Sequence, residues 1–147
     1  MNAHDAVVDA ILTALRAAPA VTAGPIDEEI DAESVAEQHA EAVSVALASS
    51  APSSETVNGH PVTWRSEVSI ECYARRDGRT VTGRASRALH ARVYARLLVD
   101  PSLGGIALGL DTPRIDIVSE VADTRLGCCI GTYGVLHRTP AGSLSQA

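Results

Sequence analysis

The feature that most constrains this chain is the stretch 62–76, where apolar and polar side chains alternate almost without interruption. Alternation with a period of two is typical of a β-strand with one face on a core and the other toward solvent or a partner. At ~3.3 Å per residue this strand would be about 50 Å long, more than twice the usual strand length. The expected core-facing residues are Val62, Trp64, Ser66, Val68, Ile70, Cys72 and Ala74. So long a strand predicts a sheet that does more than hold a small domain together.

Helical periodicity on both sides of this strand predicts two amphipathic helices, over 3–18 and 80–98. In the first helix, Asn2 is the expected N-cap and Pro19 the expected stop. In the second helix, we expect the core-facing stripe to be Val81, Ala85, Ala88, Leu89, Ala95 and Val99, widened by Val93, Leu97 and Leu98.

Further strands are expected over 42–49, 113–122 and 126–138, with a helical turn near 32–40 and a short irregular strand possible within 21–30. In 113–122, Ile115, Ile117 and Val121 form the apolar face, opposite Arg114, Asp116 and Glu120. The fold class is therefore α+β: a mainly antiparallel sheet with two helices packed on one face. Residues 1–139 are expected to form a single domain and 140–147 a flexible C-terminal tail.

The charge of the chain is unevenly distributed. The net charge is −6, which argues against sequence-independent nucleic-acid binding. Residues 17–64 carry eight acids and no Arg, whereas residues 65–96 carry eight Arg and three acids. Two interpretations remain open: solvated faces that partly pair within one chain, or a dipolar protomer that docks head to tail on copies of itself.

Neither a membrane segment nor a reactive site is expected from the sequence. No apolar run approaches ~20 residues, and the N-terminus lacks the basic region of a signal peptide, which favours a cytosolic product. Cys128 and Cys129 are adjacent, so in a strand they point to opposite faces and cannot easily bind one ion. The histidines form no metal-binding pair, and there is no nucleophile elbow or phosphate-binding loop. We therefore expect no catalytic, cofactor-binding or metal-binding residues.

Four strings, taken in order, resemble the tail-terminator (tail-completion, minor tail) family of long-tailed phages, the group that includes the lambda tail terminator. These strings are AVSVALASS, WRSEVSIECYARR, the turn DPSLGG and the closing YGVLHRT. The resemblance covers roughly 1–140, and residues 20–41 depart from it because they are less strand-like. It implies a non-enzymatic virion protein that forms a hexameric ring on the finished tail tube, ends tube polymerisation and offers a surface for joining the head.

The resemblance also implies partners: copies of the chain itself, the major tail tube protein and a head-completion or neck protein, with the genome able to pass through the ring lumen. The expected location is the head-proximal end of the tail, after assembly in the host cytoplasm. From the charge distribution we expect a subunit interface with Arg75, Arg76 and Arg79 on one side and Asp27, Glu28, Glu29 and Asp31 on the other. The alternatives are another neck or head–tail joining protein, or a small oligomeric α+β enzyme or ligand-binding domain with a polar pocket.

Overall fold

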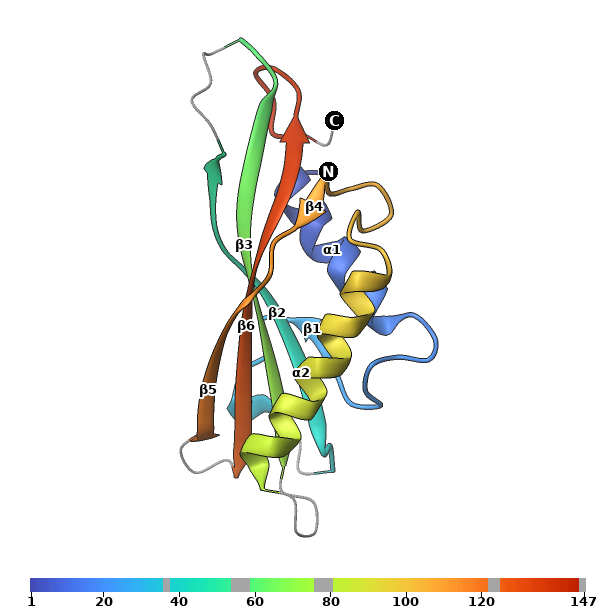
Figure 1. The fold of residues 1–147 in the computed structure, drawn as a ribbon, viewed down its shortest axis with the longest axis vertical. Coiled ribbons are helices and arrows are strands. Elements are labelled where there is room, and N and C mark those ends of the chain that lie inside the picture. The colour runs from blue at the N-terminus through green and yellow to red at the C-terminus, as the bar shows by residue number, and fades with distance from the viewer. Residues whose placement is uncertain (36–37, 54–58, 76–80, 122–124, 146–147) are drawn as a thin grey trace.

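The alternating stretch forms the strand β3 (Val62–Arg75), which lies at the centre of a six-stranded sheet (Figure 1). The computed structural model describes residues 1–35, 38–53, 59–75, 81–121 and 125–145. In chain order, the other elements are α1 (Ala3–Arg16), β1 (Ile26–Glu28), the 3₁₀ helix η1 (Ala32–Ser34), β2 (Glu41–Pro52), α2 (Thr82–Val99), β4 (Gly109–Leu110), β5 (Arg114–Val121) and β6 (Leu126–Thr139).

The sheet has the strand order β1-β2-β3-β6-β4, and β5 also pairs with β6. All pairs are antiparallel except β1 with β2. Along one side of β6, β4 pairs with Leu136 and Val135 and β5 pairs with the half of β6 that begins at Leu126. The predicted α+β class and its mainly antiparallel sheet are confirmed. β1 lies within 21–30, where a short strand was considered possible, whereas its parallel pairing with β2 and the short β4 were not predicted.

The helix α1 begins where the sequence predicts, because the Asn2 side chain accepts the backbone N–H of His4 at 2.8 Å. It ends at Arg16, before Pro19. Both helices lie on the same side of the sheet, α1 nearer the end at which β3 begins and α2 nearer the end at which β3 finishes (Figure 1). Their apolar faces and one face of β2, β3 and β6 enclose the main core, which includes Ile11, Leu15, Val43, Ile70, Leu89, Leu97, Tyr133 and Val135.

The expected core-facing stripe of α2 is wrong in part. The buried residues of α2 are Ser86, Leu89, His90, Val93 and Leu97. Of the residues expected in the stripe, Ala85 is only partly buried, and those that are exposed are Val81, Ala88, Ala95, Leu98 and Val99. Ser86 is compatible with burial because its hydroxyl donates to the carbonyl of Gly83 at 3.0 Å, and His90 because it is hydrogen-bonded to Tyr133 at 2.9 Å. Two satisfied polar residues thus occupy the face that contacts the sheet.

A second, smaller core lies on the opposite face of the sheet. There Tyr73, Leu126 and Cys128 pack with Ala42 and Val35, and the segment that contains η1 covers them. Within the helical turn expected near 32–40, the structure has the 3₁₀ helix η1 over Ala32–Ser34, and residues 36–37 lie outside the described residues. This face of the sheet was expected to be mostly polar. Tyr73 is the residue of β3 that packs in this second core.

The apolar face of β5 is exposed, contrary to expectation. On this face Ile115 and Ile117 are each 50% exposed, and Val118, which alternation places on the opposite face, is 39% exposed. They are exposed because β5 pairs only with β6 and forms an edge of the sheet in the part of the chain that the structure describes.

The segment after β6, expected to be a flexible tail over 140–147, returns to the start of α1. The backbone N–H of Ala3 donates to the carbonyl of Leu144 at 2.8 Å, and Asn2 forms an isolated antiparallel β-bridge with Ser145.

Candidate subunit interface and surface pockets

The acidic residues of the expected interface lie together at the β1 edge of the sheet. Asp27 and Glu28 belong to β1, Glu29 follows it with a positive φ of 54°, and Asp31 precedes η1. All four are exposed. Asp27 is paired with Arg16 at 2.6 Å, whereas Glu28, Glu29 and Asp31 form no ion pair with any described residue. The β1 edge therefore presents three carboxylates that have no ion-pair partner in the described part of the chain.

Of the basic residues expected opposite this cluster, the structure describes only Arg75. Arg75 points into its own chain, where Nε donates to the carbonyl of His39 and Nη2 to the carbonyl of Val35, each at 3.0 Å. Arg76 and Arg79 lie outside the described residues. Arg75 thus ties Val35 and His39 to the end of β3.

Part of the segregated charge pairs within the chain, as the first of the two interpretations expects. Arg92 on α2 contacts the carboxylate of Glu41 at 2.5 Å and also donates to the carbonyl of Val21. Arg96 donates to the carbonyls of Ala14, Ala17 and Pro19. Arg84 and Arg87, also on α2, are exposed and form no ion pair with the residues that the structure describes.

An apolar pocket of about 390 Å³ lies between α2 and the chain that leads into β5. Arg87, Ala91 and Tyr94 line it from the helix, and Pro113 and Ile115 from the opposite wall. At its base His90 is hydrogen-bonded to Tyr133, and burial lowers the pKa of His90. The sequence did not predict this pocket, because it indicated the apolar face of the strand that carries Ile115 and Ile117 but not the place of that strand at the edge of the sheet. The signal that was present is Pro113 just before the strand that carries Ile115 and Ile117, because proline in a sheet is confined to edge strands, to the first residue of a strand or to bulges.

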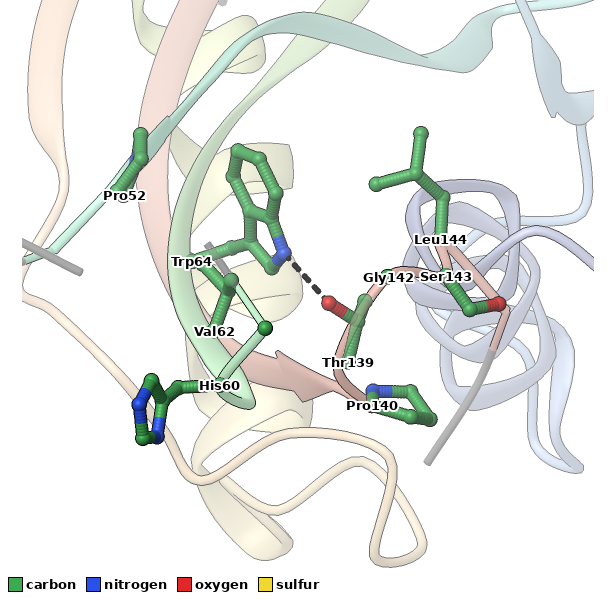
Figure 2. A pocket seen from close by; sticks show the side chains of 10 residues that line it. Pro52, His60, Val62, Trp64, Thr139, Pro140, Gly142, Ser143 and Leu144 are labelled. Carbon is green, nitrogen blue, oxygen red and sulfur yellow. Dashed lines mark hydrogen bonds between the residues drawn. The ribbon is translucent and has the colours of Figure 1, made fainter. Parts of the chain in front are cut away.

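A second pocket, of about 430 Å³, lies at the other end of the molecule, between the start of β3 and the segment after β6. Figure 2 shows Trp64 at its wall, with indole Nε1 donating to Thr139 Oγ1 at 2.9 Å. Trp64 was expected to be substantially buried, and the structure leaves it partly buried because this pocket opens beside it. Its indole N–H is therefore already satisfied within the chain.

A buried polar cluster lies near this second pocket. His137 Nε2 is 2.7 Å from Ser66 Oγ, which is 2.9 Å from Ser50 Oγ, and the ring of His4 packs edge-on against His137. Ser66 is 0% and His137 1% exposed, so this hydroxyl–imidazole pair has no access for a substrate. Burial, and secondarily the charge of His4, lower the pKa of His137 to about 4. The pair acts as a polar link between the two central strands.

The cysteines are distributed as their adjacent positions predict. Cys129 lies in the main core and Cys128 in the second core, on opposite faces of β6, and Cys72 is the cross-strand partner of Cys129. All three are free thiols, and burial raises the pKa of Cys128 to about 12. Among the described residues, no group of three or more His, Cys, Asp or Glu side chains is placed to hold a metal ion.

No family model matches the chain, and no curated protein matches it. In the part of the chain that the structure describes, neither helix combines the length and the apolar character that crossing a membrane requires.

Proposed function

We propose that this chain is a tail terminator of a long-tailed phage: a structural protein that forms a ring on the tail tube, stops tube polymerisation and provides the surface to which the head is joined. Its partners in this role are copies of itself, the major tail tube protein and a head-completion or neck protein. The role requires shape and contact surfaces, and no catalytic residue, metal or cofactor.

The observation that carries the proposal is the order of the four strings that resemble the family. In the fold, three of these strings fall in the neighbouring strands β2, β3 and β6. The fourth is the turn after α2, where Asp100 accepts the backbone N–H groups of Ser102 and Gly104 at 3.1 and 2.8 Å. The turn also needs positive φ at Leu103, Gly104 and Gly105. These strings thus correspond to the central sheet and to one specific helix end.

The open edges of the sheet also support a role in assembly. A protein that works as a ring needs two different surfaces on each subunit, one for each neighbour. Here the two sides of the sheet differ in chemistry, with exposed carboxylates beside β1 and exposed isoleucines on β5. Such a pair of unlike edges suits a head-to-tail assembly better than a two-fold dimer.

The decisive experiment is deletion of the gene in its phage, followed by electron microscopy of the particles. We expect tails of abnormal length that fail to join heads, and restoration by the gene supplied in trans. Tails of normal length beside unjoined heads would replace this proposal with the neck-protein alternative. Gene order gives an independent check, because a terminator gene should directly precede the gene for the major tail tube protein.

A ligand-binding or enzymatic role is the alternative from another class, and the two pockets are the places to test it. The polar groups that the structure describes at these pockets are largely used internally, as Trp64 with Thr139 and His90 with Tyr133 illustrate. Screening the purified chain against small-molecule libraries by thermal shift tests this alternative. A saturable ligand in either pocket, together with tails that assemble normally without the gene, would favour it.

A further inference from the structure

The two edges of the sheet lie level with each other, and this relationship is set by strand register. One row of paired residues runs Glu28, Val45, Ile70, Gly131 and Ile115 across β1, β2, β3, β6 and β5. Two rows away, Ile26 and Ile117 occupy the same two edges. A sideways repeat of the molecule would therefore bring the β5 edge of one copy directly opposite the β1 edge of the next.

The strand directions suit this approach. β5 is antiparallel to β6, which is antiparallel to β3, which is antiparallel to β2, and β1 is parallel to β2. β1 therefore runs opposite to β5, so a sideways repeat places the two edge strands antiparallel. Antiparallel approach is a common way for an unpaired edge strand to be covered by another chain.

The charges of the two edges are complementary. Beside β5, α2 presents Arg87, which borders the apolar pocket and forms no ion pair with a described residue. Beside β1, Glu28 and Glu29 are exposed and equally without an ion pair in the described chain. Opposite charges on the two sides of one molecule favour contact between successive copies over contact between like edges.

We propose that the β5 edge, together with the apolar pocket between α2 and β5, receives the acidic β1 edge of a second copy of this chain. Burial of Ile115 and Ile117 supplies most of the affinity, because exposed ion pairs contribute only ~0.2–1 kcal/mol each. The carboxylates meet Arg87 and set the register. Side chains dominate the contact at β1, since the carbonyl of Ile26 already accepts Arg16 Nε at 2.7 Å.

This inference deepens the proposed ring by identifying its subunit contact. It replaces Arg75 with Arg87 as the basic partner, because Arg75 is bonded to carbonyls of its own chain. A stable contact of this kind should bury at least ~1,000 Å² in total. The exposed isoleucines and the pocket beside them form the natural centre of such an area.

The test is sedimentation velocity of the purified chain over a concentration series. We expect the wild-type chain to self-associate, and Ile117→Asp and Arg87→Glu each to shift the association midpoint at least tenfold toward higher concentration. Leu98→Asp and Arg138→Glu are the matched controls, because Leu98 is also exposed and Arg138 is an exposed cation at the other end of β6. Circular dichroism verifies that every variant remains folded.

The charge-swap variant Arg87→Glu with Glu29→Arg should recover most of the lost association, which a merely destabilised fold would not do. The inference is overturned if Ile117→Asp and Arg87→Glu associate like the wild type, or if the wild type remains a monomer up to ~1 mM. Complementation of the deleted phage separates the two proposals. If the chain associates through this edge but deletion of the gene causes no tail defect, the proposed function is wrong and the contact stands. If deletion causes a tail defect and the Ile117→Asp and Arg87→Glu variants both restore normal tails, the contact is wrong and the function stands.

Discussion

Ser66 and His137 join the two central strands through a hydrogen bond of 2.7 Å that is buried on all sides. Ser66 is the single polar residue in the core-facing set of β3, and the structure gives it a partner on β6. Nδ1 of His137 is buried and has no hydrogen-bond partner among the described residues, so protonation of the ring would place a charge in a site that cannot solvate it.

Folding stability should therefore depend on pH through His137. Its pKa is lowered from 6.5 to about 4, so between these pH values the unfolded chain binds more protons than the folded one. The neutral ring of His137 contributes up to about 3 kcal/mol to the free energy of unfolding. This contribution is complete above about pH 6.5 and is lost progressively as the pH falls toward 4. Burial lowers the pKa of His90 as well, which acts in the same direction.

Urea unfolding between pH 7 and 4 measures this dependence. His137→Asn should flatten the loss of stability over that window, whereas His60→Asn, at an exposed position, should leave the slope unchanged. Equal slopes for wild type and His137→Asn would contradict the prediction.

Gly127 should not tolerate a side chain. A Cβ at this position would lie 2.6 Å from backbone atoms of Thr82, at the point where α2 begins against β6. Backbone can yield less than a flexible side chain, so Gly127→Ala should cost at least the ~1–3 kcal/mol typical of overpacking. Gly109→Ala is the matched control because a Cβ there meets nothing within 4 Å. Thermal melts of the two variants should differ clearly, and similar melting temperatures would count against this packing.

Arg75→Ala should destabilise the chain by about 1–2 kcal/mol, because it removes charged hydrogen bonds to the carbonyls of His39 and Val35. Arg138→Ala, which loses only a 3.4 Å contact with Thr63, should stay within about 0.5 kcal/mol of wild type. Chemical denaturation measures both. If Arg75→Ala unfolds like the wild type yet weakens self-association, Arg75 belongs to the subunit contact after all.

The thiols should act as packing groups. Cys128→Ala and Cys129→Ala should each cost about 1 kcal/mol, since each removes a buried sulfur from a different core. A chelator should leave the melting temperature of the wild-type chain unchanged. A fall in that temperature on adding chelator, restored by zinc, would show that the cysteines bind metal.

The sequence predicted the elements well where one periodicity dominates. β3 and α1 were located to within a few residues because strict alternation and an N-cap followed by an apolar stripe leave little choice. The buried face of α2 was misassigned because alanines lie on several faces of this helix, and because the face that is buried includes the polar residues Ser86 and His90. Their burial depends on hydrogen-bond partners, one of them Tyr133 on a strand more than forty residues later.

The candidate site was less predictable, for a physical reason. The acidic cluster could be read from the sequence, since Glu28 and Glu29 are consecutive. The exposed isoleucines could not, because alternation in Ile115 and Ile117 is the same for a strand inside a sheet and a strand at its edge. Strand order decides between the two, and that order depends on contacts between distant parts of the chain.

The pairing of β3 with β6 also has a consequence during synthesis. The paired residues closest in sequence, Arg75 and Leu126, are about 50 residues apart. While the β2–β3 hairpin is already outside the ribosome, the long second edge of β3 has no partner until β6 follows. In that interval the nascent chain carries a bare, apolar-faced strand of the kind that captures foreign strands. The yield of native protein in the cell would then depend on chaperones that bind the unpaired strand during that interval, more than on the final stability of the fold.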